Sequence, residues 1–153
     1  MAGTNQRQTV DRRVNTSEGH YVRWEISVRD LHLLRSWHFV KNYRTFCKTS
    51  PTSWDFKMWF PEVREDGTAS LSVSLTRIDS VNVDLEASIW VDIDNLEENL
   101  IFPKQSFTKG GMAPGSEMQE TVEIVPLPNM RAAIHQNVIV LVTLTISSCH
   151  SSE

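Results

Sequence analysis

The chain has 153 residues, 40% of them hydrophobic, and its 15 Lys and Arg against 19 Asp and Glu give a net charge of −4 at pH 7. The length suits one domain with its own core. The charges are interspersed, with no basic stripe and no polybasic segment, so nucleic acid and membrane lipid are not expected partners. Cys47 and Cys149 are too few for a disulfide framework, and no signal peptide is apparent. We therefore expect a cytoplasmic or nuclear location.

The first elements are predicted from composition and alternation. Residues 1–19 are polar and lack periodicity, so we expect a flexible leader, then one domain at 20–148 and a tail at 149–153. Apolar and polar residues alternate over residues 21–28, which predicts a strand. Residues 30–34 fit either a loop or a short helical turn. A second, irregular strand is expected between Trp37 and Phe46.

The strongest local pattern is a β-hairpin over residues 54–75. Apolar side chains alternate over residues 54–60 and Pro61 closes the run. An acidic Gly turn at residues 65–67 then precedes a second alternating run over residues 71–75. This pattern indicates two paired strands with one buried face.

The second half of the chain also shows patterns typical of strands. Strict alternation over residues 83–93 predicts the cleanest strand, while Ile101 and Phe102 hint at another and residues 121–125 at a third. Residues 138–146 are apolar on both faces for half their length, which indicates a central strand. About eight short strands with polar turns indicate an all-β fold, an antiparallel β-sandwich. Its expected core contains Trp24, Trp54, Phe56, Leu71, Leu75, Leu85, Ile89, Val140 and Leu144.

One Gly-rich interval is expected to be a loop. Residues 109–116 contain three Gly and one Pro, and loops held on rigid sheets often carry binding residues. A plain surface connection is the other interpretation. The interval lacks the Gly-Lys-Ser/Thr ending and the following helix of a phosphate-binding loop, so a nucleotide site is not expected.

Residues with catalytic or metal-binding chemistry are few. The five histidines are scattered, and none forms a pair at a ligand spacing such as His-x-x-x-His. Cys47 is expected to behave as a small buried hydrophobe. The acidic group at residues 92–98 matches no calcium loop, which favours a solvated turn over a cation site. We therefore predict no catalytic residue, no metal, no cofactor and no enzymatic activity.

Trp90 is notable for the sheet face on which it lies. Alternation turns Ile89 and Val91 inward, so Trp90 shares the opposite face with Ser88 and Asp92. A large aromatic on a polar sheet face is either covered by a neighbouring segment or offered to a partner. Both interpretations remain open at this stage.

The order of these motifs resembles the meprin and TRAF homology (MATH) domain, nearest to the speckle-type POZ group. The similarity covers roughly residues 20–148 and consists of short aromatic and aliphatic motifs at compatible spacing. They are Tyr21-x-x-Trp24-x-Ile26, Phe46, Trp54 to Pro61, the acidic Gly turn, Leu71 to Leu75, the strand from Val83, Phe107 before a Lys-Gly segment, Val122-Glu123-Ile124, and the closing strand before Ser147.

The resemblance implies an eight-stranded TRAF-like sandwich that binds extended peptides in a shallow groove. In the speckle-type group it also implies substrate recognition for a cullin-based ubiquitin ligase through a BTB domain that follows. The chain departs from the family where Ser74 and Ala87 replace groove aromatics and where residues 110–115 lack a Trp-Gly-Phe motif. The family's peptide specificity is therefore not carried over.

Two functional classes follow from the sequence. The first is a non-catalytic domain whose Ser74, Trp90, Lys109 and Met112 line a surface for an extended peptide of a protein partner, with micromolar or weaker affinity. The second is a structural or assembly sandwich, capsid-like or lectin-like, whose exposed residues contact other subunits or glycans. The oligomeric state is not indicated by either.

Overall fold

The computed structural model describes residues 8–15 and 19–147. Within this range the chain forms nine strands and two short 3-10 helices. The strands are β1 (Gln8–Asn15), β2 (Gly19–Val28), β3 (His38–Arg44), β4 (Ser53–Val63), β5 (Ala69–Arg77), β6 (Leu85–Asn95), β7 (Gln105–Met112), β8 (Glu117–Ile124) and β9 (Val138–Ser147), and the helices are η2 (Leu31–Ser36) and η3 (Arg131–His135). Neither helix is long and apolar enough to span a membrane.

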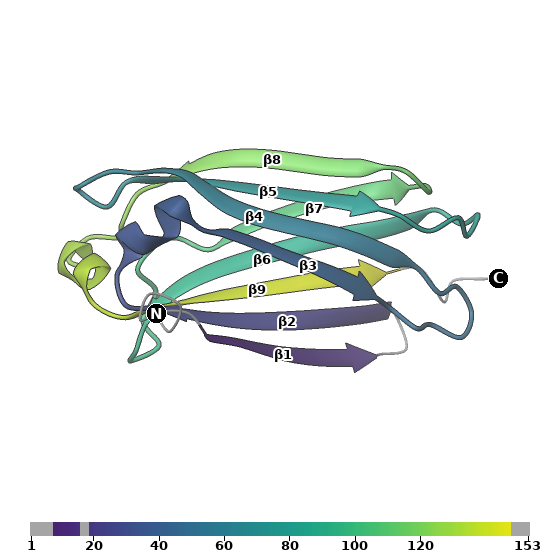
Figure 1. Cartoon of the computed structure of the whole chain (residues 1–153), viewed down its shortest axis with the longest axis horizontal. Coiled ribbons are helices and arrows are strands. Elements are labelled where there is room, and N and C mark those ends of the chain that lie inside the picture. Colours follow the sequence, from purple (N-terminus) through teal and green to yellow (C-terminus); the bar gives the residue numbers. More distant parts are fainter. Residues whose placement is uncertain (1–7, 16–18, 148–153) are drawn as a thin grey trace.

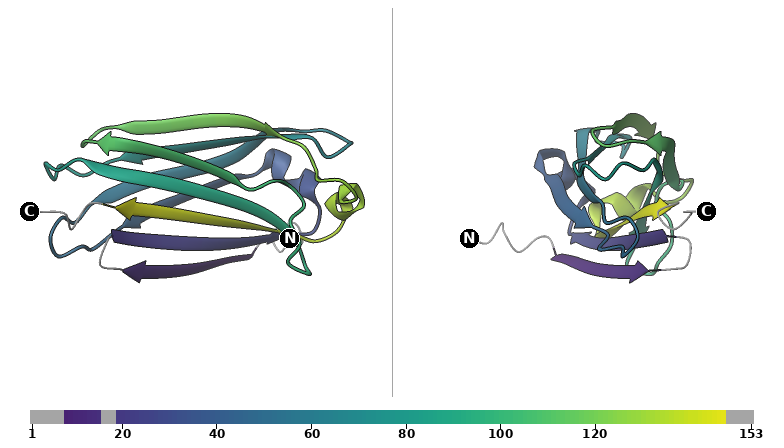
Figure 2. Two further views of the ribbon diagram at one scale, coloured as in Figure 1. Left: turned by 180° about the vertical axis from the view of Figure 1, so that it is seen from behind. Right: turned by 90° about the vertical axis from the view of Figure 1, so that its right-hand side faces the viewer.

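The strands form two antiparallel sheets that face one another (Figures 1 and 2). One sheet, called sheet A here, has five strands in the order β1-β2-β9-β6-β7, and sheet B has four in the order β3-β4-β5-β8. The fold is therefore the all-β antiparallel sandwich that the alternation predicts. The long apolar strand β9 lies in the middle of sheet A between β2 and β6, as its sequence indicates.

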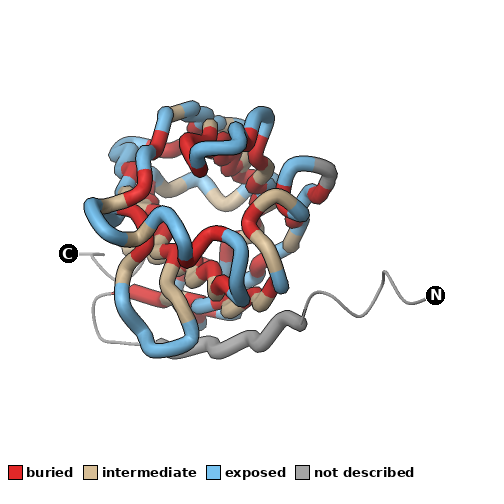
Figure 3. The backbone as a smooth tube through the Cα atoms, turned by 90° about the vertical axis from the view of Figure 1, so that its left-hand side faces the viewer, coloured by how far each residue is buried: buried red, intermediate tan, exposed pale blue. Residues whose placement is uncertain are grey.

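The inward faces of both sheets form one apolar core. Figure 3 shows buried residues alternating with more exposed ones along the chain. All nine residues expected in the core are at most 1% exposed. Trp24 of sheet A lies 5.5 Å from the ring of Phe56 in a stacked arrangement and 5.6 Å from Phe39 edge to face. Because Phe56 and Phe39 belong to sheet B, these ring contacts join the two layers.

The β4–β5 hairpin has its predicted buried face and its predicted turn. Gly67 has φ +94°, a conformation that favours glycine, and an added Cβ would lie 2.8 Å from the Pro126 side chain. The prediction that Pro61 ends the first strand is wrong, because β4 continues to Val63. The pairing shifts register between Trp59 and Glu62, and such a bulge tolerates a proline that cannot donate a ladder hydrogen bond.

Three further expectations are corrected by the structure. Residues 8–15 of the expected leader form β1, which pairs antiparallel with the edge of β2 through main-chain groups that no side-chain pattern reveals. Ile101 and Phe102 are buried but belong to the β6–β7 connection instead of a strand. The Gly-rich interval is a loop only at residues 113–116, since residues 109–112 continue β7.

The glycines explain why that last strand is hard to recognise. Gly111 has φ +61°, and the pairing of β6 with β7 shifts register between Leu85 and Ala87, opposite this stretch. A bulge often needs a residue that accepts a positive φ, so glycine here accompanies an irregular strand. The ambiguous segment after β2 resolves into the short helix η2, where the Asp30 side chain accepts the His32 backbone N–H as an N-cap.

Candidate functional site

The four residues expected to bind a peptide do not share one surface. Trp90 lies on the outer face of sheet A and is 43% exposed, whereas Ser74 lies on the outer face of sheet B. Met112 is completely buried in the core. The hypothesis of a single face is wrong because the connection between β5 and β6 carries the chain from sheet B to sheet A.

Ser74 and Lys109 are nevertheless brought together, through Glu117. The Ser74 hydroxyl donates to a Glu117 carboxylate oxygen at 3.2 Å, and the Lys109 Nζ donates to the Glu117 backbone carbonyl at 2.8 Å. Lys109 belongs to β7 at the edge of sheet A, and Glu117 begins β8 at the edge of sheet B. We call these two consecutive edge strands, with their connection at 113–116, the β7–β8 rim.

The rim combines charge with open strand edges. Lys109 pairs in register with buried Ala87, and Glu120 pairs with buried Val73, so both charged residues occupy inward-facing positions. Both are nevertheless exposed, which places water at this side of the sandwich. Inward-pointing charges at sheet edges suppress indiscriminate strand pairing. A strand that pairs here must therefore complement the charges.

The side chains of β8 make the rim acidic. Glu117, Glu120 and Glu123 are all exposed, and the strand carries no Lys or Arg. A hydroxyl pair adds polar groups beside them, since Ser72 and Thr121 lie 2.8 Å apart across the β5–β8 pairing. The rim therefore offers acceptors and negative charge, with little apolar surface.

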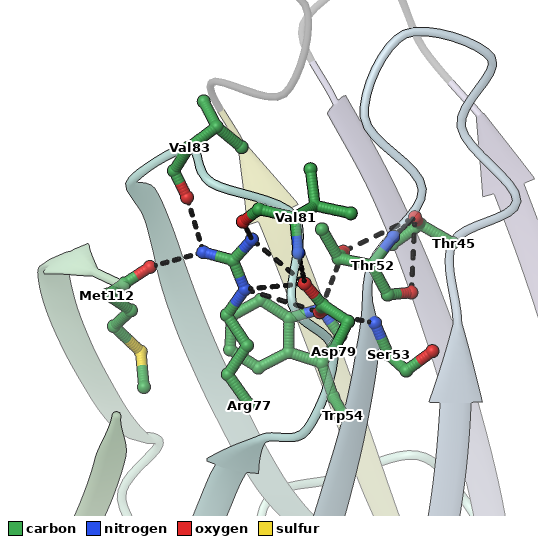
Figure 4. A network of polar contacts seen from close by, with 9 residues as sticks. All are labelled: Thr45, Thr52, Ser53, Trp54, Arg77, Asp79, Val81, Val83 and Met112. Atoms are coloured by element: carbon green, nitrogen blue, oxygen red, sulfur yellow. Dashed lines mark hydrogen bonds and ion pairs between the residues drawn. The ribbon is translucent and has the colours of Figure 1, made fainter. Parts of the chain in front are cut away.

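A buried ion pair fixes the neighbouring end of β7 (Figure 4). Arg77 is fully buried, and its guanidinium donates to the carboxylate of Asp79 and to three backbone carbonyls, those of Val81, Val83 and Met112. It also lies 5.8 Å from the Trp54 ring. This group could not be predicted from the sequence, because an Arg at an inward position of a strand becomes interpretable only when its acceptors are known.

Asp79 is held in its ionised form by this network. Burial raises its pKa, but hydrogen bonds from Arg77 and from the backbone N–H groups of Ser53 and Val81 lower the pKa more, to below the ordinary value. The Ser53 N–H lies 2.8 Å from the carboxylate. Asp79 therefore ties the start of β4 to the connection that follows β5.

The outer face of sheet A carries a separate, open cavity of about 260 Å³. Its lining combines Arg23, Glu25, Asp94, Asn95 and Glu98 with the partly exposed side chains of Ile139 and Leu141. Trp90 lies on the same face, in the cross-strand row that runs from Arg23 through Thr143. The sequence left open whether a neighbouring segment covers Trp90, and the structure shows that its side chain is exposed.

Asp94 is the unusual carboxylate of this cavity. Its Oδ1 atom is buried and accepts no hydrogen bond within the described residues. Burial raises the pKa of Asp94, and repulsion from Asp92 and Glu98 raises it further, while Lys104 and Arg23 lower it less. A buried carboxylate oxygen without a partner is suited to a ligand that donates hydrogen bonds.

The remaining chemical candidates are placed as follows. Cys47 is 3% exposed, in accordance with its prediction as a small buried residue, and Cys149 lies outside the described residues. His32 and His135, far apart in the sequence, come together with Asp30 as a possible set of metal ligands. No spacing rule reveals that set, because its members come from the β2–β3 and β8–β9 connections.

Comparison with known proteins adds little to this geometry. No family model and no curated protein matches the chain. Among solved structures, one similar chain is an arabinose-bound MgGH51 α-L-arabinofuranosidase, with 9% sequence identity and a TM-score of 0.26. The match covers 95% of this chain and 23% of that one. A likeness at this level assigns neither a family nor an activity.

Proposed function

We propose that the chain is a non-catalytic protein-interaction domain that binds an extended peptide along the β7–β8 rim. The observation that carries the proposal is the convergence of Ser74 and Lys109 on Glu117 beside two open strand edges. An extended peptide can pair its main chain with an exposed edge, which provides affinity without a deep pocket. The resemblance to MATH domains supports the same mode of binding.

The charges of the rim select the partner. Because Glu117, Glu120 and Glu123 are exposed three residues apart along one strand, an extended segment with Lys or Arg at the same spacing complements it, whereas an acidic segment is repelled. The rim offers little apolar surface, so the affinity is expected to be micromolar or weaker, corresponding to about 8 kcal/mol or less. Binding is also expected to weaken as salt is added.

The experiment compares two glutamates of equal charge on different sheets. We expect Glu120→Lys to weaken binding of a fluorescently labelled basic peptide by at least about tenfold, a loss of about 1.4 kcal/mol. Glu86→Lys, an exposed substitution on β6 of sheet A, is the control and should leave binding unchanged. Fluorescence anisotropy measures the Kd of both variants for the peptide, at two salt concentrations. Equal losses in the two variants, or preferential binding of an acidic peptide, would contradict the proposal.

A wider role belongs to the same proposal. If the rim selects substrates for a cullin-type ubiquitin ligase, as the resemblance implies, a full-length protein containing a BTB domain should bring a rim-bound partner to the cullin. Co-purification of partner and cullin with wild-type protein, and loss of the partner alone with Glu120→Lys, is the expected result. Retention of the partner by that variant would argue against substrate selection at the rim.

The cavity on sheet A favours a second candidate, the lectin-like module. Arg23, Asp94 and Asn95 supply hydrogen-bonding groups on the sheet face that also carries the exposed Trp90, and such groups suit the hydroxyl groups and apolar ring faces of a sugar. A glycan array with wild-type protein and Trp90→Ala tests this candidate. Glycan binding that the substitution removes would favour it over the peptide at the rim.

A further inference from the structure

We infer that Asp30, His32 and His135 form a site for a divalent transition-metal ion such as Zn²⁺. One ligand atom from each residue lies within 4.8 Å of the others. The three residues come from two connections, with Asp30 and His32 at the start of η2 and His135 at the end of η3. Figure 1 shows both helices at the same end of the sandwich.

The hydrogen bonds of His32 prepare one ring nitrogen as a ligand. Its Nε2 lies 3.0 Å from the backbone carbonyl of Arg64, and because a carbonyl only accepts, Nε2 carries the proton. Nδ1 is then the nitrogen that can offer a lone pair. Metal-binding histidines usually donate their other N–H to such a carbonyl or carboxylate, which fixes the ring orientation. The Arg64 carbonyl supplies this outer contact.

The contact between His32 and Asp30 needs a positive charge. Nδ1 of His32 lies 3.0 Å from Oδ1 of Asp30, and two lone pairs at that distance repel one another unless a proton or a metal ion satisfies them. A metal ion can replace the proton and draw in the third residue. Oδ2 of Asp30 already lies 3.8 Å from Nδ1 of His135.

His135 can complete the site with a small movement. Its side chain is 61% exposed, and its ring stacks on that of His32 with centroids 5.5 Å apart. Rotation of this exposed ring turns a nitrogen toward the ion. Tetrahedral Zn²⁺ with bonds of about 2.0–2.2 Å brings its ligand atoms to about 3.5 Å from one another, so a separation of up to 4.8 Å needs to shorten by at most about 1.3 Å. Water would take the fourth position.

This inference departs from the prediction that the chain holds no metal. It also extends beyond peptide binding, because the bound ion would join the β2–β3 and β8–β9 connections at one end of the sandwich, next to the β4–β5 turn that holds Arg64. An ion that binds the folded state alone stabilises it by mass action. The expected consequence is a more stable fold, with no catalytic step involved.

The test is a titration of the chelator-treated full chain with zinc chloride, followed by calorimetry. We expect one zinc per chain, and a rise in Tm of about 5–10 °C when free zinc exceeds its Kd by about a hundredfold. Asp30→Asn keeps an acceptor for the η2 cap but removes the charge, and His135→Ala changes only an exposed side chain. Each should weaken zinc binding at least about tenfold.

The matched control is His38→Ala, which removes an exposed histidine that lies near Trp59 and outside the cluster. It should bind zinc as the wild type does. Cobalt(II) titration gives a second readout, since a four-coordinate site produces a visible absorption that should disappear in His135→Ala. Failure of the wild type to bind one equivalent, or equal zinc affinity in His135→Ala and His38→Ala, would overturn the inference.

Discussion

Asp79 and Asp94 are two aspartates whose surroundings shift their pKa in opposite directions. Asp79 accepts hydrogen bonds from Arg77, Ser53 and Val81, and its pKa lies below the ordinary value. Asp94 has a buried oxygen without a partner in the described part of the chain, and its pKa lies above the ordinary value. The first carboxylate is fully used by the fold, whereas the second is not.

The difference separates structural polar groups from available ones. A buried ion pair with all its acceptors satisfied costs a great deal when one member is removed, although its net contribution to stability is small. A carboxyl group without a partner weakens the fold when it ionises, and such groups persist where a ligand or a solvent contact uses them. Substitutions at the two sites should therefore change stability in opposite directions.

The largest effect is expected at Arg77. Arg77→Met removes the charge that balances Asp79 and leaves three backbone carbonyls without their donor. We expect a loss of about 3–5 kcal/mol in the free energy of unfolding, measured by urea denaturation. Arg44→Met, at an exposed position of β3, is the control and should change stability by less than about 0.5 kcal/mol. A small loss at Arg77 would show that the network is dispensable.

The next effect concerns acid stability through Asp79. Because the pKa of Asp79 is lowered in the fold, its contribution is present above the ordinary value of 3.8 and is lost as the pH falls through the lower folded value. Asp79→Asn should cost about 1–3 kcal/mol at neutral pH and should lose less stability than the wild type on acidification. Urea denaturation at a series of pH values measures both. Parallel curves for the two proteins would refute the role of this carboxylate.

Most of the fold could be predicted because burial repeats with the period of a strand. The alternation over residues 54–60 and the long apolar run over 138–146 correspond to β4 and to the central strand β9. β1 could not be found in this way, since main-chain pairing at a sheet edge leaves no pattern in the sequence. Gly110 and Gly111 concealed the end of β7 for the related reason that a bulge breaks alternation.

The candidate sites were less predictable because they depend on connections between sheets. Trp90 was correctly placed outward from the alternation of one strand. Its distance from Ser74 depends on the crossing from sheet B to sheet A, and local spacing carries no information on that crossing. The same holds for Arg77, whose acceptors lie in the β5–β6 connection and at the end of β7, and for the pairing of His32 with His135.

A smaller effect is expected at Trp90. Trp90→Ala removes an exposed aromatic on β6 and should cost about 1 kcal/mol or less. Peptide binding at the β7–β8 rim should persist in this variant, since the rim does not include Trp90. Thermal unfolding and fluorescence anisotropy measure the two properties. Loss of peptide binding with an intact fold would instead move the binding surface to the outer face of sheet A.

The smallest effect, and the one of opposite sign, is expected at Asp94. Its raised pKa means that the folded chain holds the proton more tightly than the unfolded chain, so its contribution to stability is present below the ordinary value of 3.8 and is lost as the pH rises through the folded value. Asp94→Asn should therefore stabilise the chain slightly at neutral pH and have no such advantage in acid. Urea denaturation at neutral pH and in acid measures the difference in the free energy of unfolding between Asp94→Asn and the wild type. Exposed Asp84→Asn is the control. If Asp94→Asn is instead less stable than the wild type at neutral pH, Asp94 is a structural carboxylate like Asp79. The unpaired oxygen would then no longer support a ligand site in the cavity.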